Sequence, residues 1–306
     1  LLLKKRFTDF DDMAEDVASK WDQRYHRLSG ESDFGFADQV NLSEAQLTHI
    51  GWAPGILIET GTPTDSVGLV LQIGGQGRLR LNGARLAEHS IGVLHSPRSY
   101  DLLNPEDTEY VVLAVHKDRL NRHFELLLGD GLNDVSTLKF ADDAAQRRAV
   151  LNLQSGLELA LTQGDWLGDR AGSDFLIDEL LDSVFLEVRP DSEPAKPPRR
   201  QELAGRAGRF IRERIGQPLS LVEVCERFKV SERSLRQGFL DRYGMTPKAY
   251  IKRHRLHQLR LLLRAASPDN LTVTKAALQS GLPHLGRTAV EYRAAFGESP
   301  SATLRS

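Results

Sequence analysis

The chain has 306 residues, of which 40% are hydrophobic and 27% charged, and its formal net charge is −2. This length allows two domains, no apolar run approaches the ~20 residues that a membrane helix needs, and the short apolar start, residues 1–3, lacks the pattern of a secretory signal. The single cysteine, Cys225, excludes an internal disulfide framework, so we expect a cytoplasmic protein without membrane contact.

Charge is divided unevenly along the chain. Residues 201–306 contain 19 lysines and arginines against 9 acidic residues, whereas residues 1–200 contain 21 against 33. A basic half beside an acidic half is typical of a protein in which one half binds a polyanion. The charge distribution therefore indicates nucleic acid as the partner of the C-terminal part.

Residues about 45–116 are predicted to form short strands. Apolar or alternating runs are separated by Gly, Pro, Asn and Asp, and these runs are residues 56–58, 67–73, 78–81, 91–94 and 110–115. The dipeptide Asn82-Gly83 favours a type I′ hairpin turn after one of them. Many short strands joined by tight turns favour a β-barrel or a jelly roll.

Residues about 118–188 carry the spacing of amphipathic helices instead. Apolar residues recur every three or four positions from Leu120 to Leu128, from Ala149 to Leu161 and from Phe175 to Val188. These faces can pack on the strands of their own domain or form a dimer contact, and the pattern leaves both alternatives open. Residues 1–188 are thus predicted to be one domain.

Residues 189–200 are predicted to be a linker. Four prolines stand within nine residues of this segment. Proline fixes φ and removes a backbone donor, so such a segment favours extended chain over a helix. The second domain is therefore expected to span residues 201–306.

The second domain contains an internal repeat. An aromatic residue, an aromatic-Gly pair and a proline recur in the same order at a separation of 53 residues, as Phe239, Tyr243, Gly244 and Pro247 and then as Tyr292, Phe296, Gly297 and Pro300. Slightly upstream the separation is 52 residues, between Cys225 and Ala277 and between Val230 and Leu282. The repeat predicts two copies of one unit, about 219–245 and 271–298, with one extra residue in the second turn.

Each copy is predicted to consist of two helices joined by a short turn. Residues 220–223 fit a capping box, and Ser231 fits the cap of the next helix. In that second helix the expected inward residues are Leu235, Phe239 and Leu240, and the expected outward residues are Glu232, Arg233, Arg236, Gln237 and Arg242. Arginine and glutamine form bidentate bonds to guanine and adenine in the major groove, so this face favours DNA recognition over a merely solvated surface.

A long helix, Lys248 to about Arg264, is predicted between the two copies, beginning after Thr246-Pro247. A rigid helix would fix the separation of two recognition helices, which must be close to one turn of B-DNA, ~34 Å, if both read the same face. Its basic residues are expected to contact phosphates or to pair with acids, and they are Lys252, Arg253, Arg255, Arg260 and Arg264.

Residues 219–306 resemble the DNA-binding domain of the AraC/XylS family of bacterial transcription regulators. The motifs that carry the resemblance are Val230-Ser231-x-x-Ser234-Leu235-x-x-x-Phe239, Tyr243-Gly244-Met245-Thr246-Pro247-x-x-Tyr250-Ile251, Gly281-Leu282-x-His284-Leu285-Gly286-Arg287 and Glu291-Tyr292-Arg293-x-x-Phe296-Gly297-Glu298-Ser299-Pro300-Ser301. The last two look most like the branch that contains the benzoate-responsive regulator. Lys229 stands where the family usually has Gly in the first turn, and we expect either a strained residue or an altered turn there.

The resemblance implies an α+β protein with an N-terminal cupin-like β-barrel and flanking helices, followed by an all-α domain with two helix-turn-helix units joined by a long helix. It assigns base reading to Arg233, Arg236 and Gln237. The equivalent residues of the second unit, Gly286, Ala289 and Val290, form few hydrogen bonds. The expected DNA-binding residues are therefore Ser231, Arg233, Arg236, Gln237, His284, Arg287, Lys252 and Arg253.

The resemblance also implies an effector pocket inside the barrel. Strand alternation gives its candidate residues as Trp52, Ile58, Val70, Gln72 and His95, each of which can equally be core. We expect no metal, because the histidines of this half are scattered, without an acidic partner at ligand spacing: His49, His89, His95 and His116. We expect no cofactor and no enzymatic activity, because phosphate-binding and nucleophile motifs are missing from the sequence.

We therefore expect a ligand-responsive transcription activator. Its predicted partners are double-stranded promoter DNA, a small-molecule effector, RNA polymerase and a second copy of the chain, with which residues 1–188 would form a homodimer. One alternative is a ligand-independent DNA binder whose barrel only dimerises. A metal-dependent enzyme fused to a DNA-binding domain is a further alternative.

Overall fold

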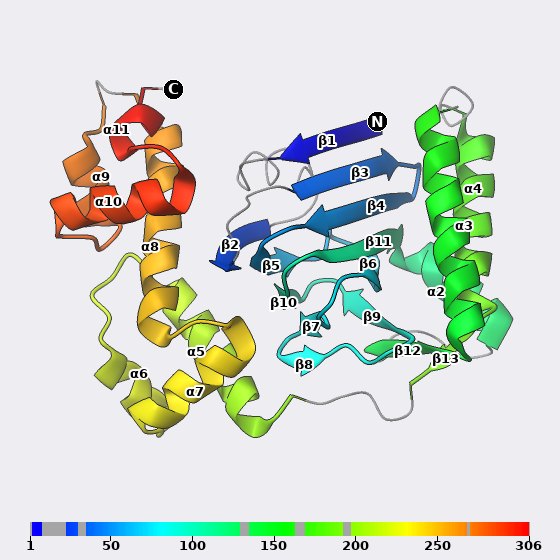
Figure 1. The fold of residues 1–306 in the computed structure, drawn as a ribbon, viewed down its shortest axis with the longest axis horizontal. Coiled ribbons are helices and arrows are strands. Elements are labelled where there is room, and N and C mark those ends of the chain that lie inside the picture. Colours follow the sequence, from blue (N-terminus) through cyan, green and yellow to red (C-terminus); the bar gives the residue numbers. More distant parts are fainter. Residues whose placement is uncertain are drawn as a thin grey trace. The chain divides into compact units, whose positions relative to one another are not determined.

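Figure 1 shows the computed structural model, which describes residues 2–7, 23–29, 35–128, 135–162, 169–191, 197–267 and 270–305. The chain divides into two compact units, Leu1–Lys196 and Pro197–Ser306. The first unit combines sheets with helices and the second is helical, so the protein is of the α+β class. Within the described ranges, no helix has the length and apolar character needed to span a bilayer.

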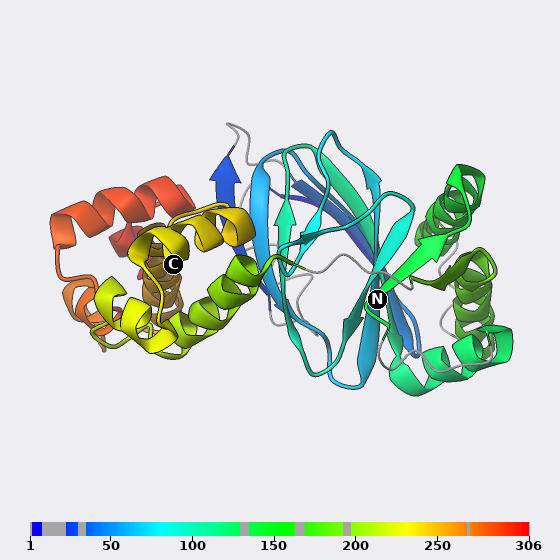
Figure 2. The ribbon, with the colours of Figure 1, turned by 90° about the horizontal axis from the view of Figure 1, so that it is seen from below.

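The first unit is built on two antiparallel sheets that face each other (Figure 2). The larger sheet has the order β1-β3-β4-β11-β6-β9-β12-β13, with the bounds Leu2–Phe7, Gly35–Asn41, Ala45–Trp52, Thr108–His116, Ser66–Gly74, Ser90–His95, Thr137–Phe140 and Val188–Pro190. The smaller sheet has the order β2-β5-β10-β7-β8, with the bounds Gln23–Ser29, Gly55–Gly61, Ser99–Asn104, Arg80–Leu81 and Ala84–Arg85. Neither sheet closes on itself among these strands, so the expected cupin-like closed barrel is not confirmed.

Apolar and aromatic side chains from both sheets fill the space between them. Trp52 and Tyr110 of the larger sheet belong to the same buried cluster as Ile58 and Tyr100 of the smaller sheet. Neighbouring residues on these strands, such as Val111, point to the opposite face and join a second cluster. This alternation follows from the two-residue period of a strand and gives the larger sheet two buried faces.

Three helices cover the outer face of the larger sheet (Figure 2), namely α2 (Lys117–Leu128), α3 (Asp143–Thr162) and α4 (Arg170–Phe185). Arg119 of α2 connects this layer, because its guanidinium lies 2.7 Å from both Asp174 and Asp178 of α4 and 3.1 Å from Glu44. The apolar faces of these helices therefore pack on the strands of their own unit, which was one of the two predicted alternatives.

The Asn82-Gly83 hairpin forms as predicted. β7 and β8 pair on either side of these two residues, and both residues have positive φ, +52° and +88°. These are the left-handed conformations that a type I′ turn requires. The predicted strand segments of residues 56–58, 67–73, 91–94 and 110–115 likewise lie in β5, β6, β9 and β11.

Several predicted boundaries were wrong. Strands begin well before residue 45, because β1, β2 and β3 add to the two sheets. The segment 118–188 is not wholly helical, since β12 and β13 extend the larger sheet by pairing with β9 and with each other. The predicted linker is shorter than 189–200, because β13 runs to Pro190 and α5 begins at Arg199, and residues 192–196 lie outside the described ranges.

The second unit consists of seven helices in its described part, and their bounds are α5 Arg199–Glu213, α6 Leu221–Phe228, α7 Glu232–Tyr243, α8 Pro247–Arg264, α9 Val273–Gln279, α10 Leu285–Phe296 and α11 Pro300–Thr303. The long α8 runs between α7 and α9 in the chain (Figure 1), and it begins one residue before the predicted start. Its C-terminal half packs against α9 and α10 through Leu256, Leu259 and Leu263.

Candidate nucleic-acid interface

Two helix-turn-helix units form the core of the second unit. The first is α6 followed by α7 and the second is α9 followed by α10. The first helices start 52 residues apart, at Leu221 and Val273, and the second helices start 53 residues apart, at Glu232 and Leu285. The predicted repeat and its extra turn residue are therefore confirmed.

The repeated aromatic residues form equivalent cores in the two units. Phe239 and Tyr243 have ring centroids 5.1 Å apart, and their counterparts Tyr292 and Phe296 have centroids 4.6 Å apart. Each second helix then ends at a left-handed glycine, Gly244 or Gly297, which is the conformation that a residue without Cβ adopts most readily. The sequence repeat thus reflects repeated packing and repeated helix ends.

Hydroxyl caps begin most of these helices. Ser231 accepts a hydrogen bond from the backbone NH of Ser234 at 3.2 Å, which fixes the start of α7. Ser220 accepts one from Glu223 at 3.1 Å, but the Glu223 carboxylate pairs with Arg214, so only half of the predicted capping box is found. His284 stands at the corresponding start of α10 and makes no side-chain cap.

The exposed face of α7 carries the predicted base-reading residues. Arg233, Arg236 and Gln237 are all exposed, and Gln237 donates to Asp241 at 2.8 Å. In the part of the chain that the structure describes, neither arginine forms an ion pair or a hydrogen bond. Their guanidinium groups are therefore available to an external acceptor.

Two predicted orientations on α7 were wrong. Arg242 was expected to face outward but is buried, with its guanidinium 5.4 Å from the centroid of the Tyr243 ring. Leu240 was expected to face inward but is exposed. The burial of Arg242 has its cause in the helix α5, which covers the side of α7 that carries Arg242 and which the hydrophobic pattern did not reveal.

Three glycines allow α5 to pack closely against α7. A Cβ placed on Gly208 would lie 2.2 Å from the Tyr243 hydroxyl, and one on Gly205 would lie 2.8 Å from the Arg242 guanidinium carbon. A Cβ on Gly238 of α7 would lie 2.6 Å from a backbone oxygen of α5. The sequence signal for this packing is therefore the Gly-x-x-Gly spacing of α5, which the sequence analysis did not use. The packing of α5 supports α7 on the side opposite its exposed face.

The exposed face of α10 has a different character. Gly286, Ala289 and Val290, the counterparts of the three base-reading residues, are exposed and apolar. Arg287 is exposed, but its Nε lies 2.8 Å from Glu291, and Lys252 of α8 lies 3.0 Å from the same carboxylate. Burial acts to raise the pKa of Glu291, but the hydrogen bonds from Arg287 and Lys252 outweigh it and lower that pKa.

The other basic residues of α8 differ in their surroundings. Arg260 is buried, and its guanidinium lies 3.4 Å from Glu298 and 4.6 Å from the Phe296 ring centroid. It therefore pairs with an acid, which was one of the two predicted alternatives. Arg253 is half-buried on the same helix. Arg255 is half-buried beside Gly281 and donates to the Gln217 carbonyl at 3.3 Å.

The residues predicted to contact an effector do not share one environment. Trp52, Ile58 and Val70 lie together between the sheets, where each is at most 2% exposed. Gln72 is on the same side, but its amide is used internally, donating to the Gly77 carbonyl at 2.6 Å and accepting from the Leu79 NH at 2.9 Å. His95 does not join them, because its imidazole lies 2.7 Å from the Val135 carbonyl, and Val135 packs against the helix-covered cluster.

Aromatic side chains surround Trp52 in the inter-sheet interior. The Trp52 indole NH donates to the Tyr110 hydroxyl at 3.4 Å, and burial raises the pKa of Tyr110. The Tyr25 ring lies 5.5 Å from the Trp52 ring. Large side chains therefore fill this end of the interior.

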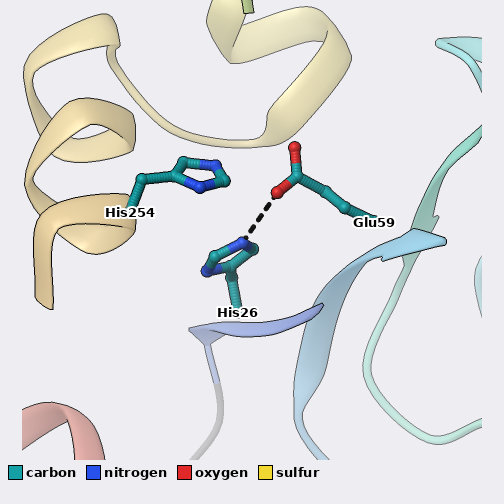
Figure 3. A group of neighbouring side chains, drawn as sticks. All are labelled: His26, Glu59 and His254. Atoms are coloured by element: carbon teal, nitrogen blue, oxygen red, sulfur yellow. Dashed lines mark hydrogen bonds and ion pairs between the residues drawn. The ribbon is translucent and has the colours of Figure 1, made fainter. Parts of the chain in front are cut away.

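The histidines of the first unit have separate partners. His49 pairs with Glu109 at 2.5 Å, His89 with Asp143 at 2.7 Å, and His116 lies near Asp118 at 3.9 Å. On the outer face of the smaller sheet, Figure 3 shows His26 of β2 hydrogen bonded to Glu59 of β5, with 3.0 Å between Nε2 and Oε2. This bond joins two neighbouring strands.

Known proteins resemble this chain mainly in the second unit. A family of helix-turn-helix domains matches residues 224–306. The XylDLEGF operon transcriptional activator of Pseudomonas putida is 42% identical over 100 residues, which are 33% of this chain and 31% of the activator. The HTH-type transcriptional activator RhaR of Pectobacterium atrosepticum is 23% identical over 208 residues, which are 68% of this chain and 71% of that protein.

Among solved structures, a probable AraC family transcriptional regulator from Rhodopseudomonas palustris is 34% identical, with a TM-score of 0.32, and the match covers 34% of this chain and 94% of that one. The match to the Pseudomonas putida activator spans about a third of that protein's length. The match to the helix-turn-helix family, residues 224–306, lies within the second unit. The second unit is a helix-turn-helix domain of the AraC/XylS type of transcriptional regulator.

Proposed function

We propose that this protein is a ligand-responsive transcription activator that binds double-stranded promoter DNA through α7 and α10. The observation that carries the proposal is the pair of helix-turn-helix units connected by α8. The first unit exposes two arginines that have no partner among the residues the structure describes. A helix of this kind places its exposed residues in the major groove, where arginine recognises guanine O6 and N7.

The two helix-turn-helix units contribute unequally to base recognition. Arg233, Arg236 and Gln237 of α7 supply most of the base specificity through bidentate hydrogen bonds. On α10 the apolar side chains of Ala289 and Val290 suit thymine methyl groups. The other proposed contacts with bases and phosphates are made by Ser231, His284, Arg287, Lys252 and Arg253.

The first unit is proposed to bind a small-molecule effector within a cupin-like fold. A hollow of about 380 Å³ lies at one end of the two sheets and is lined by Gln46, Ser66, Ala114 and His116, among other residues. Ala114 also belongs to the buried cluster between the sheets, and Trp52 lies at the opposite end of the same pair of strands. The polar lining suits a ligand with hydrogen-bonding groups.

A homodimer and a contact with RNA polymerase complete the proposal. Leu151 and Leu159 lie two turns apart on α3 and are 61% and 40% exposed, and Phe175 of α4 is 61% exposed. Exposed apolar side chains on neighbouring helices suit a contact with a second copy of the chain. We place the protein in the cytoplasm, where promoter DNA and the polymerase are found in bacteria, and we assign it no enzymatic role.

The test is a binding titration on DNA from upstream of the protein's own gene, with random competitor DNA, at two salt concentrations. Tight binding to one fragment that resists competitor supports sequence-specific recognition. Equal, weak binding to all fragments that disappears as salt rises would leave only the electrostatic contribution and would refute the proposal.

The ligand dependence has its own test. A thermal-shift screen of small metabolites should identify a compound that stabilises the protein by about 2.7 kcal/mol at 100 times its dissociation constant. That compound should also change the affinity for the upstream fragment. A compound that shifts the melting temperature but leaves DNA affinity and transcription unchanged would favour the ligand-independent alternative.

A further inference from the structure

A hollow of about 330 Å³ lies between the two helix-turn-helix units. Its residues come from α8, from the start of α6 at Leu219 and Leu221, and from the second unit between Gly281 and Glu291. The two units therefore approach each other around a shared space, beside the helix that connects them.

Positive charge gathers around this hollow. Lys248, Lys252, Arg255 and Arg287 line it, and Glu291 is its single carboxylate. Glu291 already pairs with two of the four cations, Lys252 and Arg287. Within the described residues, Lys248 and Arg255 have no acidic partner, so the hollow retains an excess of positive charge.

Arg255 is only partly satisfied inside the protein. Its guanidinium can donate five hydrogen bonds, but among the described residues it makes one, from Nη2 to the Gln217 carbonyl at 3.3 Å. Its Nε is buried and has no partner there, and burial lowers the pKa of Arg255. A buried cationic donor without an acceptor is costly, and an oxyanion removes that cost.

The backbone around Arg255 keeps its side chain in place. Gly281 has φ +72°, and a Cβ at this position would lie 3.0 Å from Arg255 Nε. Gln217, on the other side, belongs to the loop before α6. Arg255 therefore connects α8 to the loop before the first helix-turn-helix unit and to the turn of the second unit.

We propose that this hollow binds a phosphate group of the DNA backbone, with Lys248 and Arg255 as its principal contacts. This inference rests on the proposed function. A duplex read by α7 in one major groove and by α10 in the next passes its backbone between the two units, where α8 separates them. Arginine and lysine beside a small polar hollow suit a phosphate, which accepts charge-assisted hydrogen bonds at several oxygens.

The test measures the salt dependence of DNA affinity for the full chain and three variants. Lys248→Gln and Arg255→Gln remove the two proposed contacts, and Arg122→Gln removes an exposed positive charge of the first unit as a matched control. Each contact variant should weaken binding to specific and random DNA by the same factor. Each should also reduce the slope of log affinity against log salt by about 1.

The outcomes distinguish failure of the proposed phosphate site from failure of the proposed function. If Arg233→Ala weakens specific binding but both Gln variants keep the wild-type slope, the phosphate site is refuted and DNA recognition stands. If the wild type shows no specific binding, the proposed function itself is refuted. Lys248 is exposed, so Lys248→Gln reports on the site even if Arg255→Gln does not fold.

A second arm distinguishes the DNA backbone from a free anion. Thermal unfolding is recorded without DNA, in inorganic phosphate and in chloride of equal ionic strength. If phosphate stabilises the wild type but not Arg255→Gln, while the DNA salt slopes of the two proteins are equal, the occupant is a free oxyanion and the backbone assignment is overturned. Equal stability in both salts, together with reduced slopes, supports the backbone.

Discussion

Lys229 and Gly281 occupy the same left-handed backbone position in the two helix-turn-helix units, at φ values of +53° and +72°. They lie 52 residues apart, and each follows the first helix of its unit. Glycine adopts this conformation without a steric penalty, whereas a residue with a Cβ is destabilised there by about 1–2 kcal/mol. The strain expected at Lys229 is therefore present, and it lies in the turn that leads into α7.

Lys229→Gly should stabilise the second unit, because it removes the clash between Cβ and the backbone. The expected gain is about 1 kcal/mol after the greater freedom of glycine in the unfolded chain is subtracted. Thermal unfolding of the variant gives the measurement. Lys229→Ala is the matched control, since it removes the same charge but retains Cβ, and equal gains for the two variants would attribute the effect to charge instead.

Gly208→Ala should destabilise the protein by about 1–3 kcal/mol, because the added methyl group would overlap the Tyr243 hydroxyl and separate α5 from α7. Gly286→Ala is the control, as nothing lies within 4 Å of its Cβ position. That variant should be stabilised by up to about 1 kcal/mol through helix propensity. Denaturant unfolding of both variants tests the contact, and a neutral Gly208→Ala would contradict it.

Arg233→Ala and Arg236→Ala should each weaken specific DNA binding by about 1–3 kcal/mol, because each removes a bidentate base contact. Binding to random DNA should fall much less. Arg122→Ala, an exposed arginine of α2, serves as the charge-matched control. Competition titrations give both affinities, and the recognition helix would have to be placed elsewhere if the ratio of specific to random affinity stayed unchanged.

Acid should weaken the packing of α2 on α4. The hydrogen bond from Arg119 lowers the pKa of Asp174 from its ordinary value of 3.8. A carboxyl group whose pKa is lowered by folding stabilises the native state above its ordinary pKa, and the contribution is lost as pH falls through and below 3.8. The interaction is therefore complete at neutral pH.

Asp174→Asn should be less stable than the wild type at pH 7, and this difference should shrink as pH falls below 4. Urea unfolding at several pH values measures it. Asp169→Asn is the control, because Asp169 precedes the same helix without capping it. A difference that is constant with pH would show that the Arg119–Asp174 pair contributes no pH-dependent stability.

The helical repeat was predictable because its determinants are local. Hydroxyl caps begin α6, α7 and α9, and the aromatic residues and the glycines that end α7 and α10 recur at a fixed separation, so these features follow from the sequence. The identity of the base-facing residues follows from the helical period, and Arg233 and Arg236 are exposed as expected. Their contacts with DNA remain a prediction.

The remaining features depend on contacts between distant segments. Arg242 is buried because Gly205 lets α5 cover it, and no periodicity within α7 reveals that neighbour. Gln72 looks like a ligand contact in the strand pattern, but it holds the loop before β7 through Gly77 and Leu79. The charged hollow at Arg255 was likewise hidden, because it requires the positions of both helix-turn-helix units.

One chain is proposed to read two consecutive major grooves on one face of DNA. Hydroxyl-radical footprinting of the bound upstream fragment tests it most directly. Two adjacent protected windows separated by one helical turn, about 10 base pairs, are expected. The double variant Arg233→Ala/Arg236→Ala should remove one of them preferentially. A single protected window, or two windows half a turn apart on opposite faces, would contradict it.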